Sequence, residues 1–470
     1  MQMLIGGRWV DKDQTIPVKN PFDESIIDQV PRADPEDVDA AFASALRGLE
    51  QMSKLSAYDR YKILRRAAEA IEGRGEELAK TLALEVGKTI REARSEVSRT
   101  VQTFTFGAEE AKRIYGEGIP FDAAPRGENK LGFTIRVPVG VVVAITPFNF
   151  PLNLAAHKVA PALAAGNSVV LKPATDTPLT DLMMGRLLLE AGLPQDALNL
   201  ITGYGQEIGD ALVTDQRGRM VTFTGSLEVG KRIMAHAGLK KATMELGSNS
   251  AVIVMGDADL EDAASRITAG AFALAGQVCI SVQRVFVQKS CFQSLVSAVV
   301  SRVNELSVGD PLSENTDMGP MISLAAAEKA GSLVQEALDG GAELACGGQR
   351  DGSLFAPTVL LNVTRRCRAC SEEAFAPIVV INSVESLDQA IAMVNDSQYG
   401  LQAGIFTADL ASALEAAKRI QVGGIMVNEV PTFRVDHMPY GGVKGSGLGR
   451  EGVKYAVEEM TEIRLVCFRT

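Results

Sequence analysis

Short apolar runs alternate with longer amphipathic stretches between residues 139 and 245. Each run is rich in β-branched residues and has the length of a strand buried on both faces, whereas the stretches between them place apolar residues at helical spacing. This alternation predicts βαβ units that build a parallel sheet. The expected strands span residues 139–145, 168–172, 198–202, 220–224 and 241–245, and the expected helices span residues 154–165, 179–191, 208–213 and 229–237.

A second α/β region is expected between residues 250 and 430. Because 470 residues exceed one ordinary core, we expect two or more domains, although no repeat or low-complexity linker marks a boundary. The expected strands span residues 251–255, 284–288, 379–384, 404–407 and 424–428, and the expected helices span residues 260–275 and 291–306.

The N-terminal region is predicted to be mainly helical. Its first helix begins at Pro35, with Asp34 as the N-cap and Asp37 as an acidic residue in the first turn. Other elements are expected near the two ends of the chain: strands at 4–10, 16–19, 133–137 and 462–469, and helices at 58–71, 76–85, 90–115 and 448–459.

The charge and composition exclude several classes of protein. A formal net charge of −11 argues against a nucleic-acid partner. No apolar run reaches the roughly 18 residues of a membrane helix, and the N-terminus lacks the pattern of a secretory signal. Six cysteines in a chain of this length indicate free thiols rather than a disulfide scaffold. We therefore expect a cytoplasmic protein with no membrane partner.

Cys367 and Cys370 form a C-x-x-C motif. A zinc site would need a second pair of ligands at suitable spacing, and the sequence has none, so no metal is expected. Coincidence is the favoured interpretation. Since the pair precedes Glu373, a redox effect on a neighbouring site is an open alternative.

The ends of two predicted strands indicate a nucleotide site. Ligands of parallel sheets bind beyond the carboxyl ends of the strands. Lys172 would bring a cation to a ribose hydroxyl or phosphate, and Gly225 would let the backbone approach a pyrophosphate at the start of the next helix. The usual G-x-G-x-x-G fingerprint is absent, so the pattern alone leaves a phosphate site and a tight turn equally open.

Cys279 is the candidate nucleophile. It lies between a small-residue helical pattern and an apolar strand pattern, where a turn could hold the thiol at a cleft. A thiolate adds readily to a carbonyl carbon. A buried cysteine that acts as a small hydrophobic residue is the alternative for any cysteine considered alone.

Further motifs favour the nucleophile. They occur in order along nearly the whole chain, at Thr146–Pro151, Lys172–Ala174, Phe223–Ser226, Glu245–Gly247, Gly276–Cys279, Glu372–Pro377 and Gly441–Lys444. Together they resemble the NAD(P)-dependent aldehyde dehydrogenase superfamily. The segments 149–157, 276–281 and 433–449 look most similar to its lactaldehyde dehydrogenase-like members.

This resemblance implies an α/β fold with three parts. Residues 1–116 and 138–246 would form a Rossmann-type dinucleotide-binding domain, and residues 247–445 an α/β catalytic domain. Residues 117–137 and 460–470 would form a small β extension for oligomerisation. A homo-oligomer, either a dimer or a tetramer built from two dimers, is therefore implied.

The resemblance also assigns catalytic roles. Cys279 would attack the aldehyde carbon to give a thiohemiacetal and then a thioester, and the Asn149 amide with the Cys279 backbone N–H would stabilise the oxyanion. Glu245 would activate the water that releases the free carboxylic acid. Lys158 and Glu451 would relay protons from Glu245. Members that transfer the acyl group to coenzyme A have a non-acidic residue at position 245, so Glu245 disfavours that reaction.

The implied cofactor is NADP or NAD. NAD-preferring members often carry Glu at the position of Thr175, so Thr175 predicts that NADP is accepted. Glu373 would bind the nicotinamide ribose, and Phe375 would pack near the ring. The implied cofactor-binding residues are Thr146, Pro147, Phe148, Lys172, Ala174, Thr175, Gly225, Ser226, Gly230, Leu246, Gly247, Glu373 and Phe375. Ser248 stands where the family has Gly, which would strain the backbone if position 248 needs a positive φ.

The implied substrate is a small-molecule aldehyde. Val278 replaces the Arg of members that act on phosphorylated aldehydes, so small hydroxy-aldehydes such as lactaldehyde or glycolaldehyde are preferred. Arg434 could bind a carboxylate or sulfonate, which leaves succinic semialdehyde and sulfolactaldehyde open, beside non-phosphorylating glyceraldehyde-3-phosphate dehydrogenase activity. The implied substrate residues are His157, Val278, Ile280, Phe433 and Arg434.

Overall fold

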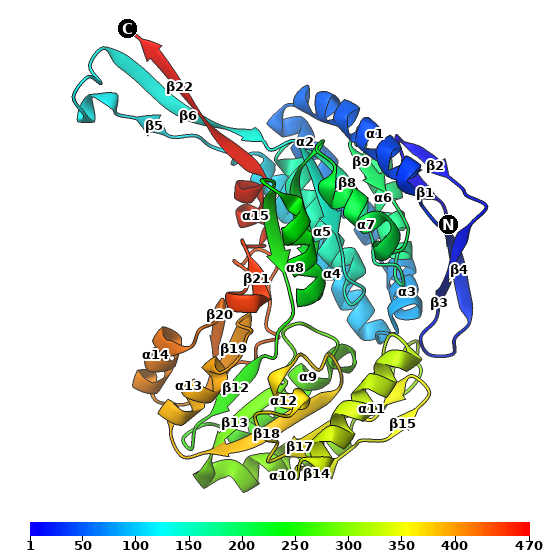
Figure 1. Ribbon diagram of the computed structural model, residues 1–470, viewed down its shortest axis with the longest axis vertical. Coiled ribbons are helices and arrows are strands. Elements are labelled where there is room, and N and C mark those ends of the chain that lie inside the picture. Colours follow the sequence, from blue (N-terminus) through cyan, green and yellow to red (C-terminus); the bar gives the residue numbers. More distant parts are fainter.

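The computed structural model describes residues 1–470 and contains two large sheets, one in each half of the molecule (Figure 1). The sheet in the upper half has eight strands in the order β2-β1-β9-β8-β7-β10-β11-β21. Strands β9 to β11 pair in parallel in this order, and the edge strands are antiparallel, so the predicted parallel sheet is confirmed. The strands are β1 (Met3–Ile5), β2 (Arg8–Val10), β7 (Val141–Ile145), β8 (Ser168–Lys172), β9 (Leu198–Leu200), β10 (Gly218–Thr224), β11 (Lys241–Glu245) and β21 (Gly447–Leu448).

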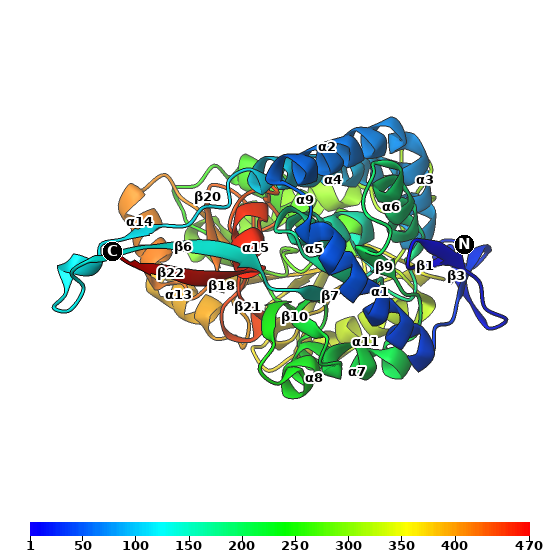
Figure 2. The same cartoon turned by 90° about the horizontal axis from the view of Figure 1, so that it is seen from above.

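Helices cover both faces of this sheet (Figure 2). One hydrophobic cluster joins the sheet to helices α2 to α6, and another joins it to α1, α7 and α8. Asp34 caps the first helix in a capping box with Asp37, as predicted. The helices are α1 (Pro35–Ser53), α2 (Ala57–Gly73), α3 (Gly75–Val86), α4 (Ile90–Ala111), α5 (Pro151–Ala164), α6 (Leu179–Glu190), α7 (Gly205–Thr214) and α8 (Leu227–Ala237).

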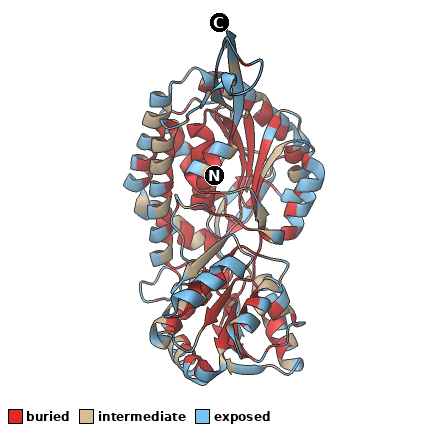
Figure 3. Ribbon diagram, turned by 90° about the vertical axis from the view of Figure 1, so that its left-hand side faces the viewer, coloured by how far each residue is buried: buried red, intermediate tan, exposed pale blue.

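The sheet in the lower half has seven strands in the order β14-β17-β18-β13-β12-β19-β20, and all pairs except β14–β17 are parallel. Its strands are β12 (Ala251–Val254), β13 (Arg284–Gln288), β14 (Glu343–Cys346), β17 (Thr358–Leu361), β18 (Ile378–Val384), β19 (Gln402–Phe406) and β20 (Gly424–Val427). Its helices are α9 (Leu260–Phe272), α10 (Phe292–Asn304), α11 (Leu324–Asp339), α12 (Arg368–Ser371), α13 (Leu387–Asn395) and α14 (Leu410–Arg419). The strands of both sheets are largely buried (Figure 3).

A narrow three-stranded sheet projects from the upper half (Figure 1). It consists of β5 (Gly118–Ile119), β6 (Lys130–Pro138) and β22 (Thr461–Arg469), and β22 pairs with β6 along its whole length. Its exposed apolar side chains are Leu131, Phe133, Ile135, Ile463, Leu465 and Phe468. Two hairpin-like pairs complete the strands: β3 (Thr15–Lys19) with β4 (Ile26–Pro31), and β15 (Arg350–Asp351) with β16 (Leu354–Phe355).

The prediction of a helix over residues 448–459 is wrong at its start. The helix, α15, spans Val453–Glu459, because Gly447 and Leu448 pair with β11 and Gly449 and Gly452 have φ values of 77° and 94°. The helix expected at residues 260–275 likewise ends at Phe272. None of the helices combines the length and the apolar character that a membrane crossing requires.

Candidate active site

A cavity of about 140 Å³ brings Cys279, Asn149 and Glu245 together. Asn149 lies between β7 and α5, Glu245 ends β11, and Cys279 lies in the loop before β13. The three predicted catalytic residues therefore reach one cavity from three separate elements. Its lining consists of Arg99, Asn149, Phe150, Asn153, Leu154, Thr224, Glu245, Leu246, Ala273, Val278, Cys279, Ile280, Thr432, Arg434, Tyr440 and Glu451.

The backbone before Cys279 turns through left-handed conformations. Leu274 and Ala275 have φ values of 49° and 51°, which residues other than glycine rarely adopt. Gly276 follows with a φ of 69°. A Cβ on Gly276 would lie 2.1 Å from the Ala376 carbonyl oxygen, so only glycine fits. This turn ends α9 and places Cys279 at the cavity.

The Asn149 side chain is held in one orientation. Its Nδ2 donates to the Gln277 carbonyl oxygen at 2.9 Å, and its Oδ1 accepts from the Phe150 backbone N–H at 3.1 Å. Because an amide nitrogen carries two hydrogens, one N–H of Asn149 remains for a ligand in the cavity.

Glu245 is buried, and neither of its carboxylate oxygens has a hydrogen-bond partner. Burial and the neighbouring Glu451 carboxylate raise the pKa of Glu245 well above its usual value, while Arg434 and Lys158 act in the opposite direction. Gly441 leaves room for this side chain, because a Cβ there would lie 2.8 Å from Glu245 Oε1.

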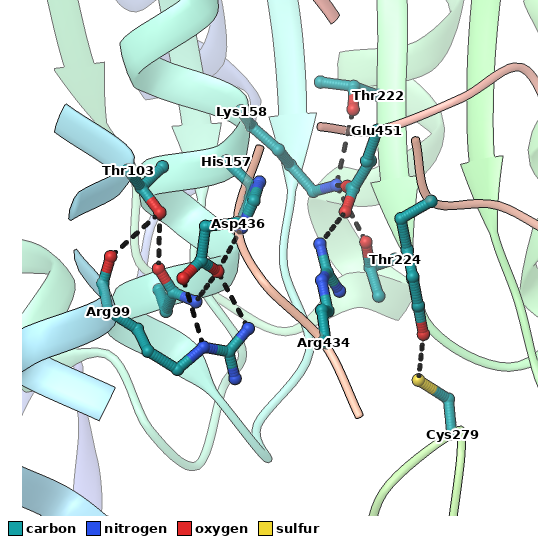
Figure 4. A network of polar contacts seen from close by, with 12 residues as sticks. Arg99, Thr103, His157, Lys158, Thr222, Thr224, Cys279, Arg434, Asp436 and Glu451 are labelled. Atoms are coloured by element: carbon teal, nitrogen blue, oxygen red, sulfur yellow. Dashed lines mark hydrogen bonds and ion pairs between the residues drawn. The ribbon is translucent and has the colours of Figure 1, made fainter. Parts of the chain in front are cut away.

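A buried ionic chain joins Lys158, Glu451 and Arg434 (Figure 4). Lys158 Nζ donates to Glu451 Oε1 at 2.8 Å and to Thr224 Oγ1 at 2.8 Å. Arg434 donates to the other oxygen of Glu451 at 3.1 Å, and its side chain is 7% exposed. Although burial opposes ionisation, these cations lower the pKa of Glu451 to about 2, so Glu451 stays charged.

Tyr440 contacts the candidate nucleophile directly. Its hydroxyl oxygen lies 3.1 Å from Cys279 Sγ, and the Arg434 guanidinium lies 3.7 Å from the centroid of its ring. Burial raises the pKa of the Cys279 thiol to about 11, and the Tyr440 and Arg434 contacts lower it less strongly.

Two of the predicted substrate residues do not line the cavity. His157 is buried and bonds to Asp436 at 2.9 Å, and Asp436 also accepts from Arg99 at 2.8 Å (Figure 4). Phe433 is 47% exposed and also lies outside the lining. Val278, Ile280 and Arg434 do line it.

A second cavity, of about 400 Å³, opens at the ends of β7 and β8. Lys172 and Thr175 both line it, together with residues of α7 and α8. Burial lowers the pKa of Lys172 to about 8. The Lys172 ammonium donates to the Pro173 carbonyl at 3.0 Å, and the Asp176 carboxylate acts on its charge without a direct ion pair. Because no carboxylate bonds to it directly, this buried ammonium remains available to an anionic ligand.

Comparison with known proteins decides the family. The family model described as the aldehyde dehydrogenase family matches residues 9–466. The chain belongs to the aldehyde dehydrogenase family. It is 50% identical over 464 residues to the 3-sulfolactaldehyde dehydrogenase of Priestia megaterium, which covers 99% of this chain and 97% of the relative. It is 42% identical over 468 residues to the lactaldehyde dehydrogenase of Methanocaldococcus jannaschii, with 99% of each chain covered.

A solved structure agrees with this assignment. Aldehyde dehydrogenase 21 of Physcomitrella patens, in complex with the reaction product succinate, superimposes with a TM-score of 0.97 at 40% identity. The alignment covers 100% of this chain and 98% of that one. This aldehyde dehydrogenase is therefore an NAD(P)-dependent oxidoreductase with an aldehyde dehydrogenase fold.

Several of the predicted cofactor-binding residues of the aldehyde dehydrogenase contact one another or neighbouring positions. The Ser248 backbone N–H donates to Glu373 at 2.9 Å, and burial raises the pKa of Glu373 to about 7. The rings of Phe148 and Phe375 meet edge to face, with centroids 5.7 Å apart. Position 248 has no positive φ, so Ser in place of Gly causes no backbone strain there.

The glycine-rich turn before α8 is compact. Ser226 caps α8 and accepts from the Val229 backbone N–H, which leaves the start of the helix at the turn that holds Gly225. A Cβ on Gly225 would lie 2.4 Å from the Phe223 ring, and one on Gly230 would lie 2.4 Å from Leu246. The turn, the helix N-terminus and Lys172 together fit a dinucleotide phosphate.

The sequence did not predict Arg99 and Tyr440 as site residues. Arg99 lies on α4, within the helix predicted over residues 90–115, and an arginine on a helix carries no signal of a site. Tyr440 directly precedes the glycine motif that begins at Gly441, and a tyrosine in a loop carries no signal of its own. Only the folded chain brings Tyr440 next to Cys279, from which it is 161 residues away.

Proposed function

We propose that this aldehyde dehydrogenase oxidises a small aldehyde with an anionic group, and that 3-sulfolactaldehyde is its first candidate substrate. Arg99 and Arg434 carry this proposal because both guanidinium groups line the same small cavity as Cys279. The buried Nε of Arg434 has no hydrogen-bond partner, so it has a donor to offer. Guanidinium groups bind carboxylate-like and phosphate-like oxygens through paired hydrogen bonds.

In the proposed acylation, the Cys279 thiolate attacks the aldehyde carbon. The carbonyl oxygen becomes an oxyanion that accepts from the free N–H of Asn149 Nδ2 and from the Cys279 backbone N–H. Removing one such donor typically lowers the rate about 100- to 1000-fold. When bound, NAD(P) would supply the hydride acceptor for the former aldehyde carbon. The residues predicted to hold it are Lys172, Thr175, the turn at Gly225 and Glu373.

In the proposed deacylation, Glu245 takes a proton from the water that attacks the thioester. The absence of any partner on its carboxylate supports this role, because both oxygens are free to meet a water. The raised pKa of Glu245 makes the carboxylate a stronger base than a solvated glutamate. Lys158 and Glu451 lie behind it and would pass the proton onward.

Lactaldehyde and glycolaldehyde form the second candidate class. Arg434 is already bonded to Glu451, and Arg99 is already bonded to Asp436. An uncharged hydroxy-aldehyde would leave both ion pairs undisturbed. Phosphorylated aldehydes fit less well, because Val278 lines the cavity and offers no charge to a dianion. Succinic semialdehyde shares the anionic end of the first candidate and is tested with it.

Steady-state kinetics test the proposal. Reduced cofactor is followed by absorbance with sulfolactaldehyde, succinic semialdehyde, lactaldehyde and glyceraldehyde 3-phosphate, each with NAD and NADP. We expect the highest kcat/KM for sulfolactaldehyde. Arg434→Met should lower kcat/KM about 10- to 100-fold more for the anionic substrates than for lactaldehyde, because any effect of Arg434 on Cys279 is common to all substrates. Equal losses for lactaldehyde would contradict an anion site. Activity retained in Cys279→Ala would overturn the mechanism.

We also propose that the projecting sheet joins subunits. The exposed apolar side chains on β6 and β22 lie on both faces of the projecting sheet and leave apolar area in contact with water. This supports a homo-oligomer in which residues 117–137 and 460–470 make contacts between copies. The domain limits proposed with it are 1–116 with 138–246 and 247–445, and the presence of two large sheets supports a division of this kind.

A further inference from the structure

The hydroxyl of Tyr440 has a single hydrogen-bond partner in the structure, the sulfur of Cys279. The two atoms are 3.1 Å apart, and Tyr440 is 2% exposed. A buried phenol that only filled space could be a phenylalanine, since leaving a hydroxyl in an apolar site has a cost. The position of the hydroxyl therefore suggests a role at the sulfur.

The backbone fixes Tyr440 in place. Its N–H donates to the Glu451 carbonyl at 3.0 Å, and its carbonyl accepts from the Glu451 N–H at 2.7 Å. This bridge couples Tyr440 to the buried ionic chain of Glu451, Lys158 and Arg434. Rotation of the side chain away from Cys279 would break its contact with the sulfur and its contact with the Arg434 guanidinium.

Arg434 makes the phenol a stronger donor. Its guanidinium lies 3.7 Å from the centroid of the Tyr440 ring, within the range of a cation–π contact. Positive charge over the ring withdraws electron density from the hydroxyl and polarises its O–H bond. The charge of Arg434 also acts on the sulfur directly, and Tyr440 adds a hydrogen bond that Arg434 does not make.

We propose that Tyr440 is a catalytic residue that donates a hydrogen bond to the Cys279 thiolate and stabilises it for attack on the aldehyde. The thiol releases its proton to water, the phenol keeps its own, and the Sγ–H bond is replaced by an O–H···S⁻ hydrogen bond. This inference rests on the proposed role of Cys279 as nucleophile. It assigns to tyrosine and a stacked arginine the task that a histidine performs in many other thiol enzymes.

The other charged groups that face Cys279 show why its thiolate needs stabilisation. Glu245 and Glu373 both oppose formation of the thiolate, and burial opposes it most. Arg434 and Tyr440 are the groups that favour it. Without the Tyr440 hydroxyl, Arg434 would be the one remaining group of these that favours the thiolate, against burial, Glu245 and Glu373.

Alkylation of Cys279 by iodoacetamide tests the inference without substrate or cofactor. A hydrogen bond to a charged group corresponds to about one to two pKa units, and a more basic thiolate is intrinsically more reactive, which offsets part of this shift. We therefore expect Tyr440→Phe to alkylate about 3- to 10-fold more slowly at Cys279 between pH 7 and 9. Mass spectrometry of the Cys279 peptide gives the rate, and the exposed Cys467 provides an internal control.

A matched variant and a second measurement complete the test. Tyr61→Phe removes a hydroxyl from α2, remote from Cys279, and should leave the rate unchanged. Incorporation of difluorotyrosine at position 440, which makes a more acidic phenol, should accelerate alkylation. An unchanged or faster rate in Tyr440→Phe overturns the inference, and so does a loss of kcat/KM without slower alkylation. Cys279→Ala remains the separate test of the proposed function.

Discussion

Lys158 and Glu451 form an ion pair in the interior of the protein, with 2.8 Å between Nζ and Oε1 and side-chain exposures of 1% and 3%. The pair keeps a negative charge on Glu451 next to Glu245. Burial raises the pKa of Glu245, and the charge on Glu451 raises it further, because two carboxylates in one buried site resist simultaneous ionisation. The ion pair thus favours the charged form of Glu451 and contributes to the raised pKa of Glu245.

Glu245→Gln should separate acylation from deacylation. The variant keeps the shape of the side chain but cannot take a proton from water, so turnover should fall about 100- to 10,000-fold. A burst of reduced cofactor of about one equivalent per site should remain in a stopped-flow trace. Normal steady-state turnover would remove Glu245 from the mechanism.

The deacylation rate of the wild-type enzyme should rise with pH. The pKa of Glu245 is raised, so the basic carboxylate is scarce below that pKa and reaches its full population above it. Single-turnover measurements from pH 5 to 10 should show one rising limb and a plateau. A rate that already lies on its plateau at pH 5 would contradict the raised pKa.

Glu85 should make stability decrease as pH rises. Burial raises its pKa from 4.5 to about 7, although Thr180 and the Leu179 N–H favour the charged form. The folded state therefore holds a proton that the unfolded state has lost, and this stabilisation is complete below pH 4.5 and disappears as pH passes 7. Glu85→Gln should remove about 3 kcal/mol of this pH dependence in urea titrations at pH 4.5 and 8. If the free energy of unfolding changed by the same amount between pH 4.5 and pH 8 in both proteins, the prediction would be wrong.

Thr175→Glu should alter the choice of cofactor. Thr175 Oγ1 donates to the Gly203 carbonyl, and the side chain lines the same cavity as Lys172. A carboxylate there would repel a 2′-phosphate and accept from a 2′-hydroxyl, so kcat/KM for NADP should fall about 10- to 100-fold more than for NAD. Thr175→Gln serves as the uncharged control. Equal losses for both cofactors in Thr175→Glu would remove position 175 from the phosphate site.

Ile463→Asp should weaken association of subunits. Ile463 is 65% exposed on β22, and a charge there would have to be buried in an apolar contact between copies. Light scattering should show a smaller particle than the wild type, whereas Glu462→Asp, on the same strand, should not change the mass. An unchanged mass for Ile463→Asp would place the subunit contact elsewhere.

The sheets were predictable because their strands are continuous apolar runs with a strand-like length. The predicted strands at 168–172 and 241–245 agree with β8 and β11 residue for residue. The start of α15 was not predictable in the same way, because the pairing of Leu448 with β11 is a tertiary contact. The local pattern of apolar residues predicts which strands and helices form. Contacts between distant segments decide where some of these elements begin.

The residues of the site also differ in how far the sequence predicts them. Cys279, Glu245 and Asn149 carry recognisable motifs, and the structure brings them to one cavity. Arg99, Asp436 and Tyr440 have no such motif, because their importance comes from a neighbour far away in the chain. Arg99 and Asp436, for example, are 337 residues apart and bond at 2.8 Å. No spacing rule reports a contact of that kind.

The segment that contains Tyr440, Glu451 and α15 continues without interruption into β22. A continuous stretch of backbone therefore connects β22 to Tyr440 and Glu451, which line the cavity at Cys279. If copies of the chain contact one another through β22, oligomerisation would stabilise the arrangement of the residues at Cys279. A separated protomer should then lose turnover on dilution while its circular dichroism spectrum stays the same.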